Sequence, residues 1–280
     1  MSYRIIIDSC GELTDWMKAD EHFVSIPLSI QLGEETIIDD DSFDQAQFFQ
    51  KLETTKAVPK TACPSPQAYM DAFSADVDHV YCVTLSDRLS GSYASAMTGC
   101  QMLLEEQPDK KVYIFNSCSA SIGESLIAMV IRSLEEKGLS FEEVIKHTED
   151  YITGQNTYFT LDTLEMLIKA GRIKGFKALI ASTLHIKPIM GSTPEGEIIQ
   201  LGTARGNLQK ALKKITDMIV ARVKHPERKI MAISHCANPE AAQALKQMVL
   251  EKVTLKDVII LDTRGISSVY AGKGGVIAVV

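Results

Sequence analysis

A strand, a polar loop and a helix follow one another repeatedly through the first half of the chain, and this order constrains the fold more than any other feature. Each short apolar run ends in a loop rich in serine, aspartate or glycine, and a stretch with helical apolar spacing comes next. Such repetition predicts a mostly parallel sheet that is covered by helices on both faces. The predicted strands are residues 4–7, 23–32, 80–85 and 111–115, and the predicted helices include about 93–104 and 122–137.

Capping signals mark the beginnings of other helices in this half. Ser42-Phe43-Asp44-Gln45 has the spacing of a capping box and precedes an apolar stripe. Ser65 followed by Pro66 predicts an N-cap and a first helical residue. Ser140 with Glu143 forms a second capping box.

The second half of the chain has a different pattern. Pro194-Glu195-Gly196 is a turn signal between two strand-like runs, so it predicts an antiparallel hairpin. The remaining elements mix strands and helices without regular alternation, which indicates an α+β domain with a mixed or antiparallel sheet. We therefore predict two domains in this α/β protein, residues 1–155 and residues 156–280. The elements predicted here are helices at about 161–170 and 207–223, a helix capped by Asn238-Pro239, and strands at 185–190, 197–202, 229–234, 257–261 and 276–280.

Charge and hydropathy exclude several classes of partner. The formal net charge of −7 argues against nucleic acid and against docking on anionic lipid, both of which call for a basic face. The N-terminus has no apolar segment of the signal-peptide kind, and no apolar run reaches the roughly 18 residues that cross a bilayer. We expect a cytoplasmic protein with no stable membrane insertion.

Most motifs of catalysis and metal binding are missing from the sequence. There is no Gly-x-Ser-x-Gly elbow, no His-Glu-x-x-His and no phosphate-binding loop, and the six cysteines lack the spacing of zinc or redox sites. We expect no metal and no cofactor. We interpret His185 as a structural histidine and Asp8 as the cap of the turn that follows it.

Hydroxyl groups and small residues gather where loops meet helices in the first half. Amides and hydroxyls at a helix N-terminus bind anions, because the helix dipole adds a partial positive charge there. In a parallel sheet, loops at the carboxyl ends of the strands are also where ligands bind. The same residues are common as caps and turn formers, so both interpretations stay open at this point. The residues are Thr61, Ser65, Ser86, Ser90, Gly91, Ser92, Ser117 and Ser119.

Five segments, in the same order along the chain, resemble the DegV family, which includes the fatty-acid-carrying subunits of bacterial fatty acid kinase. Ile5-Ile6-Ile7-Asp8-Ser9 resembles the opening strand of the family, and Thr61-Ala62-Cys63-Pro64-Ser65 its Thr-Ser-x-Pro-Ser loop. Leu89-Ser90-Gly91-Ser92-Tyr93 is similar to its Leu-Ser-Gly-Thr/Ser-Tyr motif. Ala170-Gly171-Arg172-Ile173 and Leu184-His185-Ile186-Lys187-Pro188-Ile189 resemble its Gly-Gly-Arg-Ile and Leu-Asn-Ile-Lys-Pro-Ile stretches.

The resemblance implies a bacterial, non-catalytic protein of two domains that encloses a long-chain fatty acid. It implies that the hydroxyls of Thr61 and Ser90 and the amide of Gly91 hold the carboxylate, with Ser92 nearby. It also implies that a partner kinase phosphorylates the bound carboxylate to an acyl-phosphate, and that Arg172 contacts the head group or that partner. By the same resemblance, Arg205 would be a second basic contact.

One motif departs from the family pattern. The family has His-x-Gly-Pro-Gly near its C-terminus, where this chain has Tyr270-Ala271-Gly272-Lys273-Gly274. Either Tyr270 replaces the histidine that helps to hold the carboxylate, or this chain binds a different head group. We favour replacement, because the flanking glycines are kept.

Two other functions remain as alternatives. The first is a hydrolase or acyltransferase with Ser90 or Ser92 as its nucleophile, which would need a nearby general base. The second is a binding protein for another small amphipathic acid, with Lys273 adding charge beside the head group.

Overall fold

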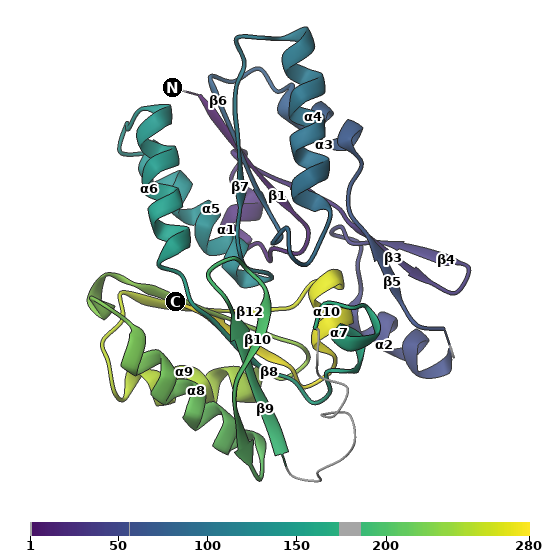
Figure 1. Cartoon of the computed structure of the whole chain (residues 1–280), viewed down its shortest axis with the longest axis vertical. Helices are drawn as coiled ribbons and strands as arrows, with labels where there is room; N and C mark the ends of the chain where they lie inside the picture. Colours follow the sequence, from purple (N-terminus) through teal and green to yellow (C-terminus); the bar gives the residue numbers. More distant parts are fainter. Residues whose placement is uncertain (1, 56, 174–185) are drawn as a thin grey trace. The chain divides into compact units, whose positions relative to one another are not determined.

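The computed structural model describes residues 2–55, 57–173 and 186–280 (Figure 1). The chain divides into two compact units. The N-terminal unit runs to Gly154 and also contains Arg264–Ile266, while the C-terminal unit comprises Gln155–Thr263 and Ser267–Val280. The short return of the chain to the N-terminal unit was not predicted.

The N-terminal unit is built on a four-stranded parallel sheet in the order β2-β1-β6-β7. This confirms the parallel sheet predicted from the alternation of strands and helices. The strands are β1 (Tyr3–Asp8), β2 (Phe23–Ile26), β6 (His79–Thr84) and β7 (Lys111–Asn116).

Helices cover both faces of this sheet, also as predicted (Figure 1). Successive side chains of a strand point to opposite faces, so Ile5 and Ile7 pack on one side and Ile6 on the other. All three side chains are fully buried. One face packs against α5 (Ile122–Glu135) and α6 (Phe141–Thr153), and the other against α3 (Pro66–Phe73) and α4 (Ser92–Glu106). The short helix α1 (Asp15–Ala19) precedes β2.

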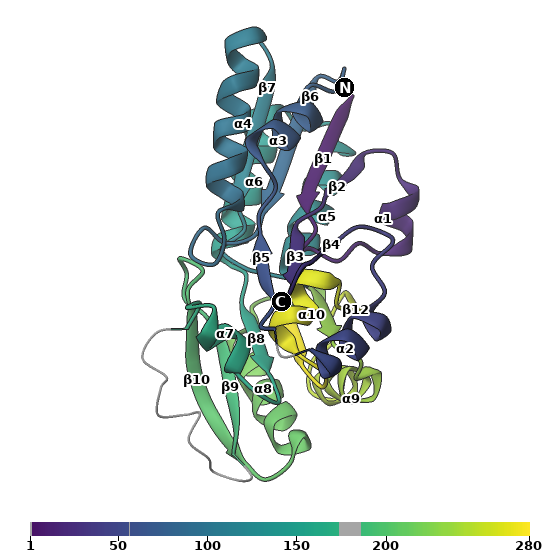
Figure 2. The ribbon, with the colours of Figure 1, turned by 90° about the vertical axis from the view of Figure 1, so that its right-hand side faces the viewer.

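The prediction of one strand over residues 23–32 is wrong. The chain forms β2 and then β3 (Ser29–Leu32), which belongs to a separate three-stranded antiparallel sheet in the order β4-β3-β5 (Figure 2). Pro27 separates the two strands, because proline has no N–H for a ladder hydrogen bond. The next amide, that of Leu28, donates to the hydroxyl of Ser9 (3.0 Å). The other strands of this sheet are β4 (Glu35–Ile38) and β5 (Lys60–Ala62).

The capping box predicted at Ser42 is also wrong. Helix α2 (Gln45–Thr54) has Asp44 as its N-cap, and the Asp44 carboxylate accepts a hydrogen bond from the amide of Gln47 (2.9 Å). The amide and the hydroxyl of Ser42 both donate to Asp40 Oδ1 (2.9 and 2.6 Å). Ser42 therefore stabilises the preceding turn and is not available to cap the helix.

The other two caps are confirmed. Ser65 accepts a hydrogen bond from the amide of Ala68 (3.2 Å), with Pro66 as the first helical residue. Ser140 and Glu143 form a reciprocal capping box at the start of α6.

The C-terminal unit contains a six-stranded mixed sheet in the order β10-β9-β8-β13-β11-β12. Strands β9 and β10 form the predicted antiparallel hairpin (Figure 2), and β11 pairs with β12 in parallel. Two helices, α8 and α9, pack on this sheet around a buried cluster that includes Ile189, Ile215 and Leu245. The strands are β8 (Thr157–Thr160), β9 (Ile186–Ser192), β10 (Ile198–Arg205), β11 (Ile230–His235), β12 (Asp257–Asp262) and β13 (Val276–Val279). The helices are α8 (Leu208–Arg222) and α9 (Pro239–Leu250), with a 3₁₀ turn at Pro226–Arg228.

Two helices of this half differ from their predictions. The helix predicted at 161–170 is the shorter α7 (Glu165–Lys169), because the Thr163 hydroxyl binds the amide of Glu165 (3.1 Å) in the turn before it. Gly171 ends it at φ +72°, a conformation that glycine adopts without strain. Helix α10 (Gly265–Ala271) was not predicted. The interpretation of His185 falls outside the described residues.

Candidate functional site

Three loops meet at the carboxyl end of the parallel sheet. The Asp8 carboxylate at the end of β1 accepts a hydrogen bond from the amide of Leu85 after β6 (2.9 Å). The amide of Ser86 donates to the carbonyl of Ser119 after β7 (3.0 Å). The loops with the hydroxyl-rich sequences are therefore joined to one another, as expected for the carboxyl ends of neighbouring parallel strands.

The N-terminus of α4 lies at this end of the sheet and carries open amides. The hydroxyl of Ser90 accepts from the amide of Ser92 (3.2 Å) and lies 3.1 Å from the Ser92 hydroxyl. Within the described residues, the amides of Gly91, Tyr93 and Ala94 have no hydrogen-bond acceptor. Gly91 is exposed, Ser90 is half-buried and Ser92 is buried. Donors arranged in this way at a helix N-terminus are able to bind an anion.

The Thr61 segment lies against the same helix. A Cβ atom added to Gly91 would lie 3.2 Å from Cys63 Sγ, two residues beyond Thr61. The Ser95 hydroxyl of α4 donates to the carbonyl of Pro64 (2.6 Å). The N-terminal unit thus brings together the Thr61 loop and the Ser90-Gly91-Ser92 motif, which are about thirty residues apart in sequence.

A buried pair of acids lies behind these loops. Asp8 accepts hydrogen bonds from the amides of Leu85 and Cys10 (2.9 and 3.1 Å), which confirms its interpretation as a turn cap. The carboxyl oxygens of Glu124 are buried and make no hydrogen bond of good geometry within the described residues. Burial raises the pKa of Glu124 well above its ordinary value, and the charge of Asp8 raises it further. Burial also raises the pKa of Asp8, but its two amide donors oppose that shift. Of this coupled pair, Glu124 is the acid whose protonated form the surroundings favour more strongly.

A third acid, Glu12, holds the loop before α5. Both of its carboxylate oxygens accept hydrogen bonds from the Ser121 hydroxyl (2.8 and 2.9 Å). Ser121 has φ 58° and ψ −136°, and Cys118 in the same loop also has a positive φ of 48°. Such conformations cost of order 1–3 kcal/mol each and persist only where surrounding contacts enforce them. Burial raises the pKa of Cys10 well above that of an ordinary thiol, which disfavours the reactive thiolate form.

The remaining predicted site residues lie in the C-terminal unit. The guanidinium of Arg172 lies 5.9 Å from the ring centre of Tyr270, so the structure places these two residues together. Arg205 is exposed at the end of β10, opposite Ile186, and Lys273 is also exposed.

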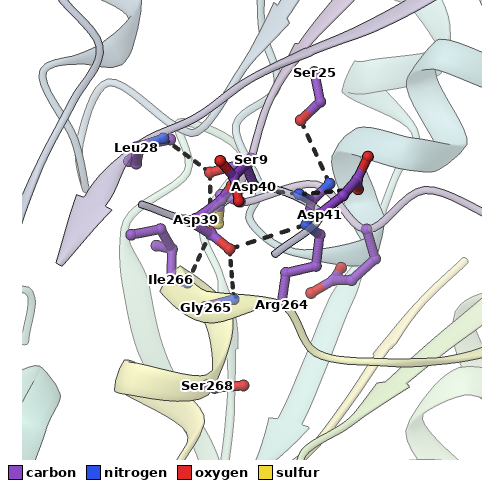
Figure 3. A network of polar contacts seen from close by, with 12 residues as sticks. Ser9, Ser25, Leu28, Asp39, Asp40, Asp41, Arg264, Gly265, Ile266 and Ser268 are labelled. Atoms are coloured by element: carbon purple, nitrogen blue, oxygen red, sulfur yellow. Dashed lines mark hydrogen bonds and ion pairs between the residues drawn. The ribbon is translucent and has the colours of Figure 1, made fainter. Parts of the chain in front are cut away.

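Several polar residues were missed by sequence reasoning. The acids Glu12, Asp39 and Glu124 are buried, and Asp39 belongs to the network drawn in Figure 3. Asp39-Asp40-Asp41 has the composition of a solvated loop, so nothing local distinguishes its first residue. The available signal was at Glu124, which stands among the apolar residues of Ile122-Gly123-Glu124-Ser125-Leu126-Ile127.

The described residues offer neither a metal site nor a membrane-spanning helix. Among the described residues, no three His, Cys, Asp or Glu side chains are placed to bind a metal ion together. None of the helices in that part of the chain combines the length and apolar character needed to cross a membrane.

The comparison with known proteins identifies the family. A family model described as "Uncharacterised protein, DegV family COG1307" matches residues 2–280. The chain belongs to the DegV family. A DegV domain-containing protein of Streptococcus gordonii is 30% identical over 280 residues, covering 99% of this chain and 98% of the relative. Another from Streptococcus pneumoniae R6 is 32% identical over 279 residues, with the same coverage.

Solved structures of DegV proteins have the same fold. The crystal structure of a DegV family COG1307 protein from Ruminococcus gnavus, refined with vaccenic acid, shares 46% identity with a TM-score of 0.97 and full coverage of both chains. The Streptococcus pneumoniae Fatty Acid Kinase (Fak) B3 protein, loaded with linoleic acid, shares 29% identity with a TM-score of 0.89, covering 100% of this chain and 99% of that one. These matches confirm the family and the α/β fold expected from the sequence motifs.

Proposed function

We propose that this DegV protein binds one long-chain fatty acid without catalysing a reaction on it. The observation that carries the proposal is the 46% identity, over full length, to the Ruminococcus gnavus protein whose structure was refined with vaccenic acid. The Eubacterium eligens DegV protein, 28% identical with a TM-score of 0.89 and 99% coverage of both chains, was loaded with heptadecanoic acid. Similar proteins thus hold fatty acids of different structure.

The N-terminus of α4 is our proposed site for the carboxylate. The Ser90 hydroxyl and the open amide of Gly91 supply donors, and the dipole of the 15-residue helix favours a negative charge there. Thr61 adds a second hydroxyl from the adjoining segment, and Ser92 holds Ser90 in place. A carboxylate can leave water for such a site only because several donors replace its hydration.

The contacts of Ser90 support binding over catalysis. Its hydroxyl is paired with the hydroxyl and the amide of Ser92, and no imidazole is among its partners in the described part of the chain. A serine nucleophile needs a base to remove its proton, and a second serine hydroxyl is too weak a base for this. The hydrolase alternative thus has no support in this geometry.

Loading of the purified protein tests the carboxylate site. A hydrogen bond to a charged group contributes about 1.5–3 kcal/mol, so Ser90→Ala should bind oleic acid about 10-fold to 150-fold more weakly than the wild type. Thr98→Ala is the matched control, because Thr98 is an exposed hydroxyl of the same helix that donates to the carbonyl of Ala94. Equal affinities of Ser90→Ala and wild type would contradict the assignment of Ser90.

We further propose that the loaded protein presents its fatty acid to a kinase. The name of the Streptococcus pneumoniae relative, Fatty Acid Kinase B3, supports such a partner. We assign Arg172, Arg205 and Lys273 to contacts with the head group or the kinase, and Tyr270 to the position of the family histidine.

Acyl-phosphate formation with ATP and the kinase of the same organism tests this step. Arg205→Ala should lower the rate of phosphorylation and leave the amount of bound fatty acid unchanged, because Arg205 is exposed at a strand end. Lys224→Ala serves as the control for a loss of positive charge, because Lys224 is an exposed cation just beyond the end of α8. A wild-type rate in Arg205→Ala would remove this residue from the partner contact.

A further inference from the structure

The carboxylate of Asp39 holds the beginning of α10. Asp39 follows β4, is completely buried and accepts hydrogen bonds from the amides of Gly265 (2.8 Å) and Ile266 (3.0 Å) (Figure 3). It also accepts from the hydroxyl of Ser9 at the end of β1 (2.9 Å). Asp39 therefore caps α10 across 226 residues of sequence.

Arg264 fastens the same segment by its side chain. Its guanidinium donates to the carbonyl of Asp39 (3.3 Å) and to the hydroxyl of Ser25 (3.5 Å), and its Nε lies 3.9 Å from Asp39 Oδ1. Arg264 also forms an ion pair with Asp41 (3.6 Å), whose side chain is 84% exposed. Substitution of Asp39 therefore tests the buried acidic partner of Arg264, and substitution of Asp41 tests the exposed one.

The segment Arg264–Ile266 lies beside the small sheet whose strand β5 carries Thr61. A Cβ atom on Gly265 would lie 2.7 Å from Asp39 Oδ1 and 3.0 Å from Ile30 Cδ1, so only glycine allows this approach. Ile30 in β3 is directly opposite Thr61 in β5, and opposed residues of an antiparallel pair project to the same face. The beginning of α10 thus packs on the face of the small sheet from which Thr61 projects.

We propose that Asp39 is a positioning residue of the fatty-acid site, an inference that rests on the proposed function. By binding the first amides of α10, Asp39 fixes Arg264–Ile266 against Ile30 and so sets the position of the Thr61 hydroxyl. Replacement of one of these acceptor oxygens by an amide NH2 loosens this segment, and the fatty acid is then released faster. Asp39 itself does not touch the ligand.

The test compares Asp39→Asn with Asp41→Asn, each loaded with oleic acid. The first replaces one carboxyl oxygen of the buried partner of Arg264, and the second replaces one of its exposed partner. Release is followed as transfer of the fatty acid to phosphatidylcholine vesicles, and thermal unfolding is measured for the empty and loaded forms. We expect Asp39→Asn to release oleic acid about tenfold faster and to gain less thermal stability on loading, because a weaker ligand stabilises less. Asp41→Asn should behave as the wild type.

A purely structural role gives a different result. In that case Asp39→Asn would lower the unfolding temperatures of the empty and loaded forms equally and leave the release rate unchanged, which would overturn the proposal. A second criterion comes from adding Asp39→Asn to the Thr61→Val variant. If Asp39 acts through the Thr61 hydroxyl, Asp39→Asn must accelerate release less in this variant than in the wild type. An undiminished effect would also overturn it.

Two further controls separate the possible failures. If Asp39→Asn does not fold, Arg264→Gln tests the same segment with the same expected increase in release, and a wild-type release rate would contradict the proposal. A wild-type protein that takes up no oleic acid would refute the proposed function itself, whereas a wild type that binds and an Asp39→Asn that releases normally would refute only this inference.

Discussion

At the scale of single residues, the most unusual feature is Glu124, a fully buried acid whose pKa is raised well above its ordinary value by burial and by the nearby Asp8. Its carboxyl oxygens make no hydrogen bond of good geometry within the described residues. Two negative charges close together in a medium of low polarity are costly, which favours the protonated form of one of the two acids. Burial raises the pKa of Asp8 as well, but the amides of Leu85 and Cys10 oppose that rise.

The raised pKa of Glu124 predicts how stability depends on pH. Its pKa in the native protein is raised above that in the unfolded chain, so the native state binds an extra proton between these two pKa values. The contribution of Glu124 to stability is therefore complete below the unfolded pKa, and it is lost as the pH rises towards the native pKa, by up to about 1.4 kcal/mol per pH unit.

Glu124→Gln should remove this slope, because glutamine does not titrate. Urea unfolding at several pH values between 5 and 8 should show a free energy of unfolding that falls less with rising pH than in the wild type. Glu142→Gln, an exposed acid on α6, is the control and should keep the wild-type slope. Parallel pH profiles for Glu124→Gln and the wild type would mean that Glu124 is ionised in the native state.

At the scale of the elements, predictions from short sequence patterns were reliable where the hydrogen-bond partners are neighbours in sequence. The apolar runs of β1, β6 and β7 and the caps at Ser65 and Ser140 were predicted from neighbouring residues alone. The predictions failed where a residue far away in sequence binds the backbone amides of the element. The amide of Leu28 binds Ser9, and α10 is capped by Asp39, neither of which is close in sequence. No local pattern could have shown these contacts.

The two serine caps provide a direct comparison. Ser65→Ala should lower the free energy of unfolding by about 1 kcal/mol, because the amide of Ala68 loses its acceptor. Ser42→Ala should change it by less than about 0.5 kcal/mol, since Ser42 is exposed and Asp44 caps α2. Chemical denaturation of both variants distinguishes them. A larger loss for Ser42→Ala would restore the capping box that the sequence suggested.

At the scale of the whole molecule, the sequence showed the fold better than the site. The family motifs identified Thr61 and the Ser90-Gly91-Ser92 turn, and the structure places both in the N-terminal unit around the start of α4. The buried acids Asp39 and Glu124 were missed, because burial depends on the packing of distant segments and acids are usually exposed. The role of Tyr270 stays a prediction.

The central claim is that this DegV protein carries a fatty acid. Mass spectrometry of an organic extract from the denatured, purified protein tests it most directly. We predict one long-chain fatty acid with a free carboxyl group, in nearly equimolar amount. An extract without fatty acid, from protein that also takes up none when oleic acid is supplied, would contradict the claim and leave only the fold.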